Sequence, residues 1–444
     1  MRSGPDTSTD TRVPDLPPGP RLPGWLQSAA FLGFRHRVMP VLRRRYGETV
    51  RLRLAGGRTA VQLSNPEHIR QMLAGSPTTF HPNRGNAVLL ALLGENSLFL
   101  ADEDEHVRLR RLLTPAFNGA ALRGYGELIT GLAVEEAERW PSAVPFSAHT
   151  RMQALTLEVM LRVVYGIADG PRLNELRSRL PELFDIGPLD LPGLQIPKLQ
   201  RYWVWRRKAE LHERVDELIR TETAERRSAP DLAGRTDVLS QLLRFSEEDD
   251  GGGLSDAELH DNLITMLVAG HETTATALAW ALYELSHDPG QLALAQRAAD
   301  ENDQRYLEAV VKESLRLHPV IHEVGRVITE PVDLGGYRLP AGTLVMGSIG
   351  LVHADPSLFE RPTVFRPSRF LDDNPPPTIW LPFGGGLRRC IGAAFSLTEG
   401  TIVLREVLRR WQLEPDGDRT ERTRVRNLML VPARGARISG VPRT

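Results

Sequence analysis

The chain has 444 residues, of which 41% are hydrophobic and 25% charged, proportions that are ordinary for a globular protein. Its formal net charge of -1 provides no overall field for nucleic acid or an anionic membrane, so we expect neither as a partner. The single cysteine, Cys390, excludes intramolecular disulfides and zinc sites built on several thiolates.

No apolar run approaches the ~20 residues that span a bilayer, and the polar residues 1–13 lack the apolar core of a signal peptide. We therefore expect a cytoplasmic protein without a membrane anchor. Repeated prolines within residues 1–24 favour a disordered tail and then a stiff extended segment. Residues 50–54 and 59–63 predict a hairpin around a Gly-Gly turn. A helix is predicted to begin at Asn65, with Pro66 at its first position.

Helices are predicted to dominate the middle of the chain. Apolar residues recur at helical spacing through residues 106–180, and a helix is expected again over about 199–227. Four prolines within residues 181–198 predict a loop between them. Ser255-Asp256-Ala257-Glu258 predicts a capping box that opens a helix reaching about His287. Apolar residues on more than one face of this helix predict that it is buried.

The last third is expected to mix short strands with helices. A helix fits residues 304–317, after a short connection over 298–304, and strands fit 326–346. A loop-rich stretch leads to a helix over about 391–410, and strands over 412–439 finish the chain. The predicted fold class is mainly α, with helices in one domain and small sheets at one side.

The most informative segment is residues 383–392, Phe-Gly-Gly-Gly-Leu-Arg-Arg-Cys-Ile-Gly. Three successive glycines permit positive φ angles, so the chain can fold tightly against a flat partner. Cys390 precedes a predicted helix, where backbone amides, the helix dipole and the charges of Arg388 and Arg389 would stabilise a thiolate. Most lone cysteines are small buried apolar residues, so the flanking pattern carries this prediction.

This segment resembles the cysteine loop of the cytochrome P450 family, Phe-x-x-Gly-x-Arg-x-Cys-x-Gly. The residues at its fixed positions are Phe383, Gly386, Arg388, Cys390 and Gly392. The resemblance implies that Cys390 is the proximal ligand of a haem b iron, that Phe383 packs under the thiolate and that Arg388 meets a haem propionate. It further implies one cytochrome P450 domain over residues 25–444, a triangular helical prism with a small β-rich lobe.

The predicted central helix carries a second pattern, Ala269-Gly270-His271-Glu272-Thr273-Thr274. Glycine and threonine are poor helix formers, and the Thr273 hydroxyl could bond to a carbonyl one turn earlier and open the helix locally. Gly270 would leave room for a flat ligand. The alternative is a kinked helix with a solvated Glu272, whereas a zinc-protease motif is excluded because Ala275 stands where its second histidine would be.

This pattern resembles the oxygen-binding motif of the same family, Ala/Gly-Gly-x-Asp/Glu-Thr-Thr/Ser. The resemblance implies that Ala269 and Gly270 lie beside the haem. It also implies that Thr273 holds the oxygen species and a water, while Glu272 relays protons from solvent. The acid–alcohol pair favours the use of O2 and electrons rather than of peroxide.

Further segments resemble the family's structural and haem-contacting elements. Residues 307–319 look like its Glu-x-x-Arg helix, which implies a buried network of Glu313, Arg316 and Arg369 rather than a surface ion pair. The residues implied to bind the haem propionates are His106, Arg110 and Arg326. A guanidinium fork suits a carboxylate, and His106 and Arg110 share one helix face.

The regions implied to contact substrate are largely apolar. The predicted contacts are Val88, Leu89, Val268, Ala269, Thr273, Val320, Ile321 and Met429. They imply a hydrophobic substrate such as a terpenoid, steroid, polyketide or fatty acid, as in secondary metabolism, although the same residues could simply be core. The expected reaction is monooxygenation by hydroxylation or epoxidation. The alternatives are desaturation or oxidative coupling, a haem protein without turnover, and a helical scaffold without a cofactor.

Electrons are expected to come from a separate protein, because little chain follows the region of resemblance. We expect a ferredoxin or flavodoxin with its reductase, which docks on a basic cluster. The cluster consists of Arg108, Arg111, Arg388 and Arg389. We expect the enzyme itself to be a monomer.

Overall fold

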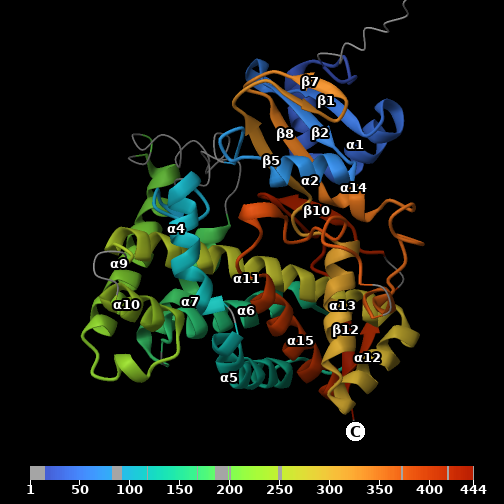
Figure 1. The fold of residues 1–444 in the computed structure, drawn as a ribbon. Coiled ribbons are helices and arrows are strands. Elements are labelled where there is room, and N and C mark those ends of the chain that lie inside the picture. The colour runs from blue at the N-terminus through green and yellow to red at the C-terminus, as the bar shows by residue number, and fades with distance from the viewer. Residues whose placement is uncertain are drawn as a thin grey trace, which may run out of the picture. The chain divides into compact units, whose positions relative to one another are not determined.

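The computed structural model describes residues 16–82, 93–117, 119–167, 169–185, 199, 202–248, 253–371, 374–417 and 420–443. The chain forms two compact units, one of Met1–Gly85 with Glu323–Val352 and the other of Asn86–His322 with His353–Thr444. The first unit is rich in strands and the second is mostly helical (Figure 1). The predicted mainly α fold class is confirmed.

The first unit is built on a five-stranded sheet with the order β1-β2-β8-β5-β3. Its strands are β1 (Thr49–Arg53), β2 (Thr59–Leu63), β3 (Phe80–His81), β5 (Glu323–Ile328) and β8 (Leu344–Ser348). β1 and β2 form the predicted antiparallel hairpin, and β2 pairs with β8 in parallel. A small core of this unit joins the sheet to α1 (Gly24–Tyr46) through Met39, Leu52, Ala60, Met346 and Leu351.

Turn and cap residues act here largely as the sequence predicts. The Asn65 side chain accepts a hydrogen bond from the Glu67 amide, and Pro66 begins α2 (Pro66–Ala74). Gly335 and Gly336 both have positive φ and connect β6 (Val332–Leu334) to β7 (Tyr337–Leu339). Helix α1 was not predicted, because its apolar residues are not confined to one face and Pro40 lies inside it.

The long helix α11 (Asp256–His287) runs through the second unit (Figure 1). It begins with the predicted capping box, in which Ser255 and Glu258 each bond to the other's backbone amide. It packs against α6 (Ala148–Tyr165), α13 (Gln304–Leu317) and α15 (Ala393–Arg410). Its buried residues lie on several faces, as expected for a central helix.

The other elements surround this centre. The remaining helices of this unit are α4 (Glu103–Leu113), α5 (Gly119–Glu138), α7 (Pro171–Phe184), α9 (Trp203–Arg227), α10 (Val238–Glu248) and α12 (Pro289–Glu301). The short α14 (Ile349–His353) follows β8. The second unit also contains two small sheets. One consists of β4 (Phe146–Ser147), β12 (Arg437–Pro442) and β9 (Trp411–Pro415), and the other of β10 (Thr423–Arg426) and β11 (Met429–Pro432). Within the described ranges, no helix has the length and apolarity that crossing a membrane requires.

Two predicted boundaries are wrong. Helix α7 continues through Pro181 to Phe184, because its buried leucines hold the last turn on the core despite the missing proline amide. The rest of the predicted loop, residues 186–198, lies outside the described residues. Helix α12 extends to Glu301, so only Asn302 and Asp303 separate it from α13. Asn302 ends the helix in the left-handed conformation, with φ 60°.

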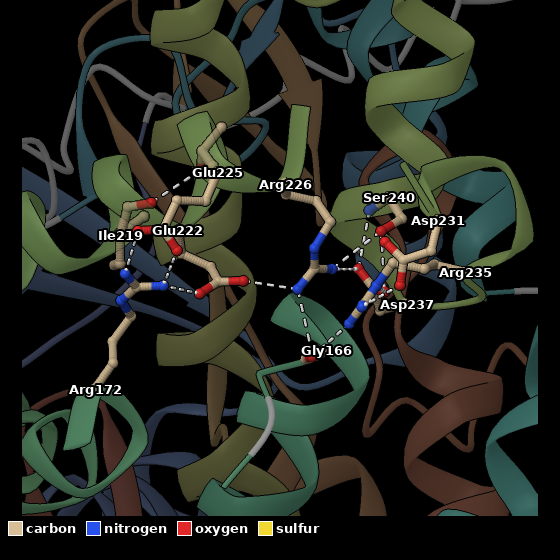
Figure 2. Close-up of polar contacts among 11 residues, drawn as sticks. Gly166, Arg172, Ile219, Glu222, Glu225, Arg226, Asp231, Arg235, Asp237 and Ser240 are labelled. Atoms are coloured by element: carbon tan, nitrogen blue, oxygen red, sulfur yellow. Dashed lines mark hydrogen bonds and ion pairs between the residues drawn. The ribbon is translucent and has the colours of Figure 1, made fainter. Parts of the chain in front are cut away.

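A buried ion network joins α9, α10 and the turn after α6 (Figure 2). The Arg226 guanidinium is 2.7 Å from Asp237 and 2.6 Å from Glu222, and it also donates to the Gly166 carbonyl at 3.3 Å. Arg235 donates to Asp237 at 3.1 Å and to the same carbonyl at 2.7 Å. Because these groups satisfy one another away from water, the network fixes the relative position of the three segments.

Candidate active site

Cys390 lies in the turn between a short 3-10 helix, Gly386–Arg388, and α15. Its backbone N–H donates to the Phe383 carbonyl at 2.9 Å, which closes the loop. Gly386 has φ 66°, a conformation that glycine adopts without strain. Ile391 and Gly392 separate Cys390 from the first residue of α15, so the cysteine lies slightly farther from the helix than predicted. The thiol keeps exposed surface.

The surrounding protein raises the pKa of the Cys390 thiol. Although the thiol is accessible, protein atoms surround it closely enough that desolvation is the largest influence. The Gly392 amide and the charges of Arg389 and Arg110 lower the pKa, but they do not outweigh desolvation. The backbone amide and the arginine charge therefore act in the predicted direction, but desolvation makes the net shift of the pKa upward. A metal ion bound to the sulfur would remove the proton outright, so this thiol suits a metal ligand.

Phe383 and Arg388 hold the loop in place. Phe383 is half-buried and meets Trp380 edge to face, with 5.8 Å between ring centroids. The Arg388 guanidinium donates to the carbonyls of Phe99 and Ala101. It also lies 3.6 Å from an oxygen of Asp102. Arg388 therefore connects the cysteine loop to the segment before α4.

Helix α4 presents a cation to Cys390. His106 is buried and Arg110 is partly buried, one turn apart as predicted. Burial lowers the pKa of the Arg110 guanidinium, whereas the nearby Cys390 raises it. In the part of the chain that the structure describes, the Arg110 side chain has no hydrogen-bond or ion-pair partner. A desolvated cation of this kind beside a thiol fits an anionic group of a cofactor.

One stretch of α11 remains accessible although most of the helix is buried. Ala269 is exposed and Thr273, one turn later, is half-exposed. The Thr273 hydroxyl donates to the Ala269 carbonyl at 2.7 Å, which is the predicted bond. The helix stays α-helical throughout, so the predicted local opening is absent. Since its proton is already donated, the Thr273 oxygen is left to accept a hydrogen bond from a bound molecule.

Gly270 serves a different purpose from the predicted one. A Cβ atom at this position would lie 2.6 Å from both Sδ and Cε of Met160, on α6. The side of Gly270 without a side chain is therefore filled by a neighbouring helix rather than left for a flat ligand. Gly270 permits the close contact between α6 and α11.

Glu272 is buried, which contradicts the alternative of a solvated side chain. Gln153 Nε2 donates to Oε2 at 2.5 Å, and Oε1 lies 3.4 Å from His149 Nε2 and 3.3 Å from Arg426 Nη1. Burial is the largest influence and by itself raises the pKa of Glu272, but these partners together lower it below the usual value. The carboxyl is therefore ionised at neutral pH.

The partners of Glu272 could not be predicted from the sequence. Gln153 is 119 positions away and Arg426 is 154 positions away, with no motif around either residue. A buried carboxylate needs hydrogen-bond donors, but this general rule does not indicate which residues of the sequence supply them.

The expected Glu313–Arg316–Arg369 network is formed. Arg316 makes two hydrogen bonds to the Glu313 carboxylate, at 2.7 and 2.9 Å, and Arg369 Nε lies 3.0 Å from both carboxylate oxygens. Arg316 also donates to the carbonyls of His353 and Pro362, at 3.0 and 2.8 Å. All three charged side chains are buried, so the network holds the segment after α14 against α13.

Three of the predicted substrate contacts come together. The Leu430 amide donates to the Val320 carbonyl at 2.8 Å, and Ile321 pairs with Met429 in an isolated β-bridge. Val268 is half-buried against the core of the unit. Val88 and Leu89 lie outside the described residues.

Arg326 belongs to the first unit, where it lies on β5. Burial lowers the pKa of its guanidinium. Nη1 donates to the Gly325 carbonyl at 2.7 Å, and no acidic residue in the described ranges pairs with this side chain. Arg326 is thus a second desolvated cation that lacks a counter-charge.

Most of the chain matches known proteins in sequence. The model of the cytochrome P450 family matches residues 14–438. Cytochrome P450 135A1 of Mycobacterium tuberculosis is 45% identical over 97% of this chain and 96% of its own length. Cytochrome P450 135B1 of Mycobacterium bovis is 44% identical, over 95% and 91%, respectively. The chain therefore belongs to the cytochrome P450 family, whose members are haem-binding oxidoreductases that incorporate oxygen from O2.

Proposed function

We propose that the protein inserts one oxygen atom of O2 into a hydrophobic small molecule, by hydroxylation or epoxidation, with haem b bound to Cys390. The observation that carries this proposal is the accessible Cys390 thiol beside Arg110, which has no partner among the described residues. Within the proposal, His106, Arg110, Arg326 and Arg388 bind the propionates. Phe383, Gly386 and Gly392 shape the loop, and Ala269 and Gly270 belong to the helix that faces the cofactor.

When bound, haem with a thiolate ligand supplies the redox chemistry of oxygen activation. The chain contributes the geometry and the protons. Thr273 accepts a hydrogen bond from a bound molecule at the accessible face of α11, because its own proton is held by Ala269. Glu272, on the same helix, provides an ionised carboxylate that can take up protons and pass them on.

The proposed substrate is a terpenoid, steroid, polyketide or fatty acid of secondary metabolism. Support comes from Val268, Val320, Ile321 and Met429, which are apolar and of which the last three lie together. Desaturation and oxidative coupling use the same site, and product analysis by mass spectrometry separates them from oxygen insertion.

A ferredoxin or flavodoxin with its reductase is the proposed electron donor. Within the basic cluster, Arg108 is paired with Glu105 and Glu258, and Arg388 is occupied by carbonyls. Arg111 and Arg389 are exposed, and these two charges therefore support docking of an acidic partner. Reversal of both should slow reduction at low salt. We take the enzyme to be a cytoplasmic monomer, which sedimentation and cell fractionation would test.

The deciding experiment is the carbon monoxide difference spectrum of the reduced protein. A thiolate-ligated haem gives a strongly red-shifted Soret band, which should disappear in Cys390→Ala and move in Cys390→His. A haem spectrum without this shift would contradict thiolate ligation, and folded protein without haem would reject the proposal. Spin-state titration with lauric acid, testosterone and geraniol would then compare three of the substrate classes. If reductant is not consumed with any of them, the result favours a haem protein without turnover.

A further inference from the structure

A polar cavity of about 590 Å³ lies in the second unit, lined by residues of α6, β10 and the end of α7. Its lining includes His149, Gln153 and Arg426, which among the described residues are the three from other elements that contact the Glu272 carboxylate. Asp185, also in the lining, pairs with Arg426 at 3.0 Å. The residues of other elements that contact Glu272 therefore all line the same cavity.

The hydrogen bonds around His149 determine which ring nitrogen carries a proton. Nε2 lies 3.4 Å from Glu272 Oε1 and 3.1 Å from Thr276 Oγ1. An ionised carboxylate can only accept, and the Thr276 hydroxyl already donates to the Glu272 carbonyl at 2.8 Å. Both neighbours therefore require a proton on Nε2, which assigns the neutral ring as the Nε2–H tautomer. Nδ1 is then the nitrogen that is free to take up a proton from water.

We propose that this cavity is the route by which solvent protons reach Glu272, with the His149 ring as the relay between them. The proposal rests on the function proposed above. A hydronium ion in the cavity gives its proton to His149 Nδ1 and leaves as water, and the Nε2 proton passes to Glu272 Oε1, so the ring is neutral again and the carboxylate becomes a carboxylic acid. Rotation of the ring, or proton exchange with water, then restores the starting tautomer. No charge accumulates, because the carboxylate gains the proton that the imidazolium loses.

The charges around the pair keep the Glu272 carboxylate ionised, so a proton that reaches it is held only briefly and can be passed on. His149 from α6 and Arg426 from β10 face the carboxylate, and His271 Nε2 on α11 itself is 3.7 Å away. Asp185 balances Arg426, while Arg424 and Arg434 also line the cavity. Gln153 donates to Glu272, but an amide does not carry protons at neutral pH. Among these groups, His149 both lines the cavity and has one ring nitrogen against Glu272, and an imidazole can accept a proton on one nitrogen while releasing one from the other.

The test uses His149→Gln, because the glutamine amide can still donate to Glu272 but cannot relay a proton. The holoenzyme is supplied with NADPH and a ferredoxin–ferredoxin reductase pair, and the peroxide released per NADPH is measured in H2O and D2O. Without a substrate, O2 is reduced either by two electrons and two protons to peroxide or by four of each to water. We expect the peroxide fraction to rise about two- to tenfold in His149→Gln, since proton delivery limits the second outcome.

The matched control is His212→Gln, which removes another histidine that faces a carboxylate, Asp216 at 3.4 Å, outside the cavity lining. It should leave the peroxide fraction unchanged. A second variant, Thr150→Phe, fills the cavity without replacing a partner of Glu272, and it should raise the peroxide fraction even if His149→Gln does not fold. Infrared spectroscopy of the Glu272 carboxylate, identified by its loss in Glu272→Gln, gives a readout that is independent of turnover.

In His149→Gln, an unchanged infrared band of the Glu272 carboxylate together with a raised peroxide fraction would support the relay. A protonated Glu272 in His149→Gln would overturn it, because His149 would then act only by holding the charge. An unchanged peroxide fraction in the folded variants would also overturn it. Failure of the proposed function has a different signature: the unaltered protein would lack the thiolate–haem spectrum or would not consume NADPH.

Discussion

Because Gly270 packs against Met160, we expect Gly270→Ala to change the free energy of unfolding in opposite directions when Met160 is present and when it is truncated. In Gly270→Ala, the new methyl group would lie 2.6 Å from two atoms of Met160, well inside van der Waals contact. Overpacking of this kind costs about 1–3 kcal/mol. Alanine recovers about 1 kcal/mol through its higher helix propensity. We therefore expect Gly270→Ala to destabilise the protein by about 0–2 kcal/mol.

Truncation of Met160 should reverse the sign of the stability effect of Gly270→Ala. Met160 is 2% exposed, so Met160→Ala alone should cost about 2–5 kcal/mol. In that background the Gly270→Ala methyl group meets no obstacle and fills part of the space left by methionine. Gly270→Ala should then stabilise the protein by about 1 kcal/mol, from helix propensity alone.

The assay is urea unfolding of the four holoproteins, followed by far-ultraviolet circular dichroism and by haem absorbance. The double-mutant cycle isolates the coupling between the two residues. A coupling near zero, with the same loss in both backgrounds, would refute the assignment of Gly270 to helix packing. Loss of haem in both Gly270→Ala proteins would instead show that this glycine faces the cofactor, as the sequence analysis suggested.

Three further predictions concern buried charges. Glu313→Gln leaves two buried guanidinium groups without a counter-charge and should cost about 3–5 kcal/mol in urea unfolding, so an unchanged midpoint would contradict the network's role. Arg226→Met should cost a similar 3–5 kcal/mol, whereas the exposed control Arg338→Gln should leave the midpoint unchanged. Burial raises the pKa of Glu399 well above its usual value, and neither carboxylate oxygen has a partner among the described residues. Since ionisation of Glu399 is disfavoured in the folded state, Glu399→Gln should stabilise the protein increasingly as pH rises above the unfolded value of 4.5, and a constant difference from pH 4 to 8 would refute this.

Local signals predicted much of the fold because their causes are local. The capping box at Ser255 and Glu258 involves side chains three positions apart, and the turn at Gly335–Gly336 follows from glycine's freedom at positive φ. Pro181 shows where such rules fail. A proline normally ends a helix, but packing of the buried leucines of α7 outweighs the lost hydrogen bond.

The same division holds for the site. Cys390, Thr273 and the Glu313–Arg316 pair could be found because each belongs to a recognisable pattern within one segment. Met160 and Arg426 could not, since their roles arise only when distant elements meet. The net rise in the pKa of the Cys390 thiol could not be predicted from the sequence either, because desolvation depends on all the protein atoms around the thiol and not on the neighbouring arginines alone.

Arg316 has a consequence for the order in which a newly made chain acquires structure. Its bonds to the carbonyls of His353, Pro362 and Val364 span 37, 46 and 48 positions, so α13 must wait for chain that is synthesised much later. Cys390 follows that segment and emerges from the ribosome later still. Under the proposed ligation by Cys390, haem capture comes late in synthesis, and fragments that end before residue 390 should not bind haem through a thiolate.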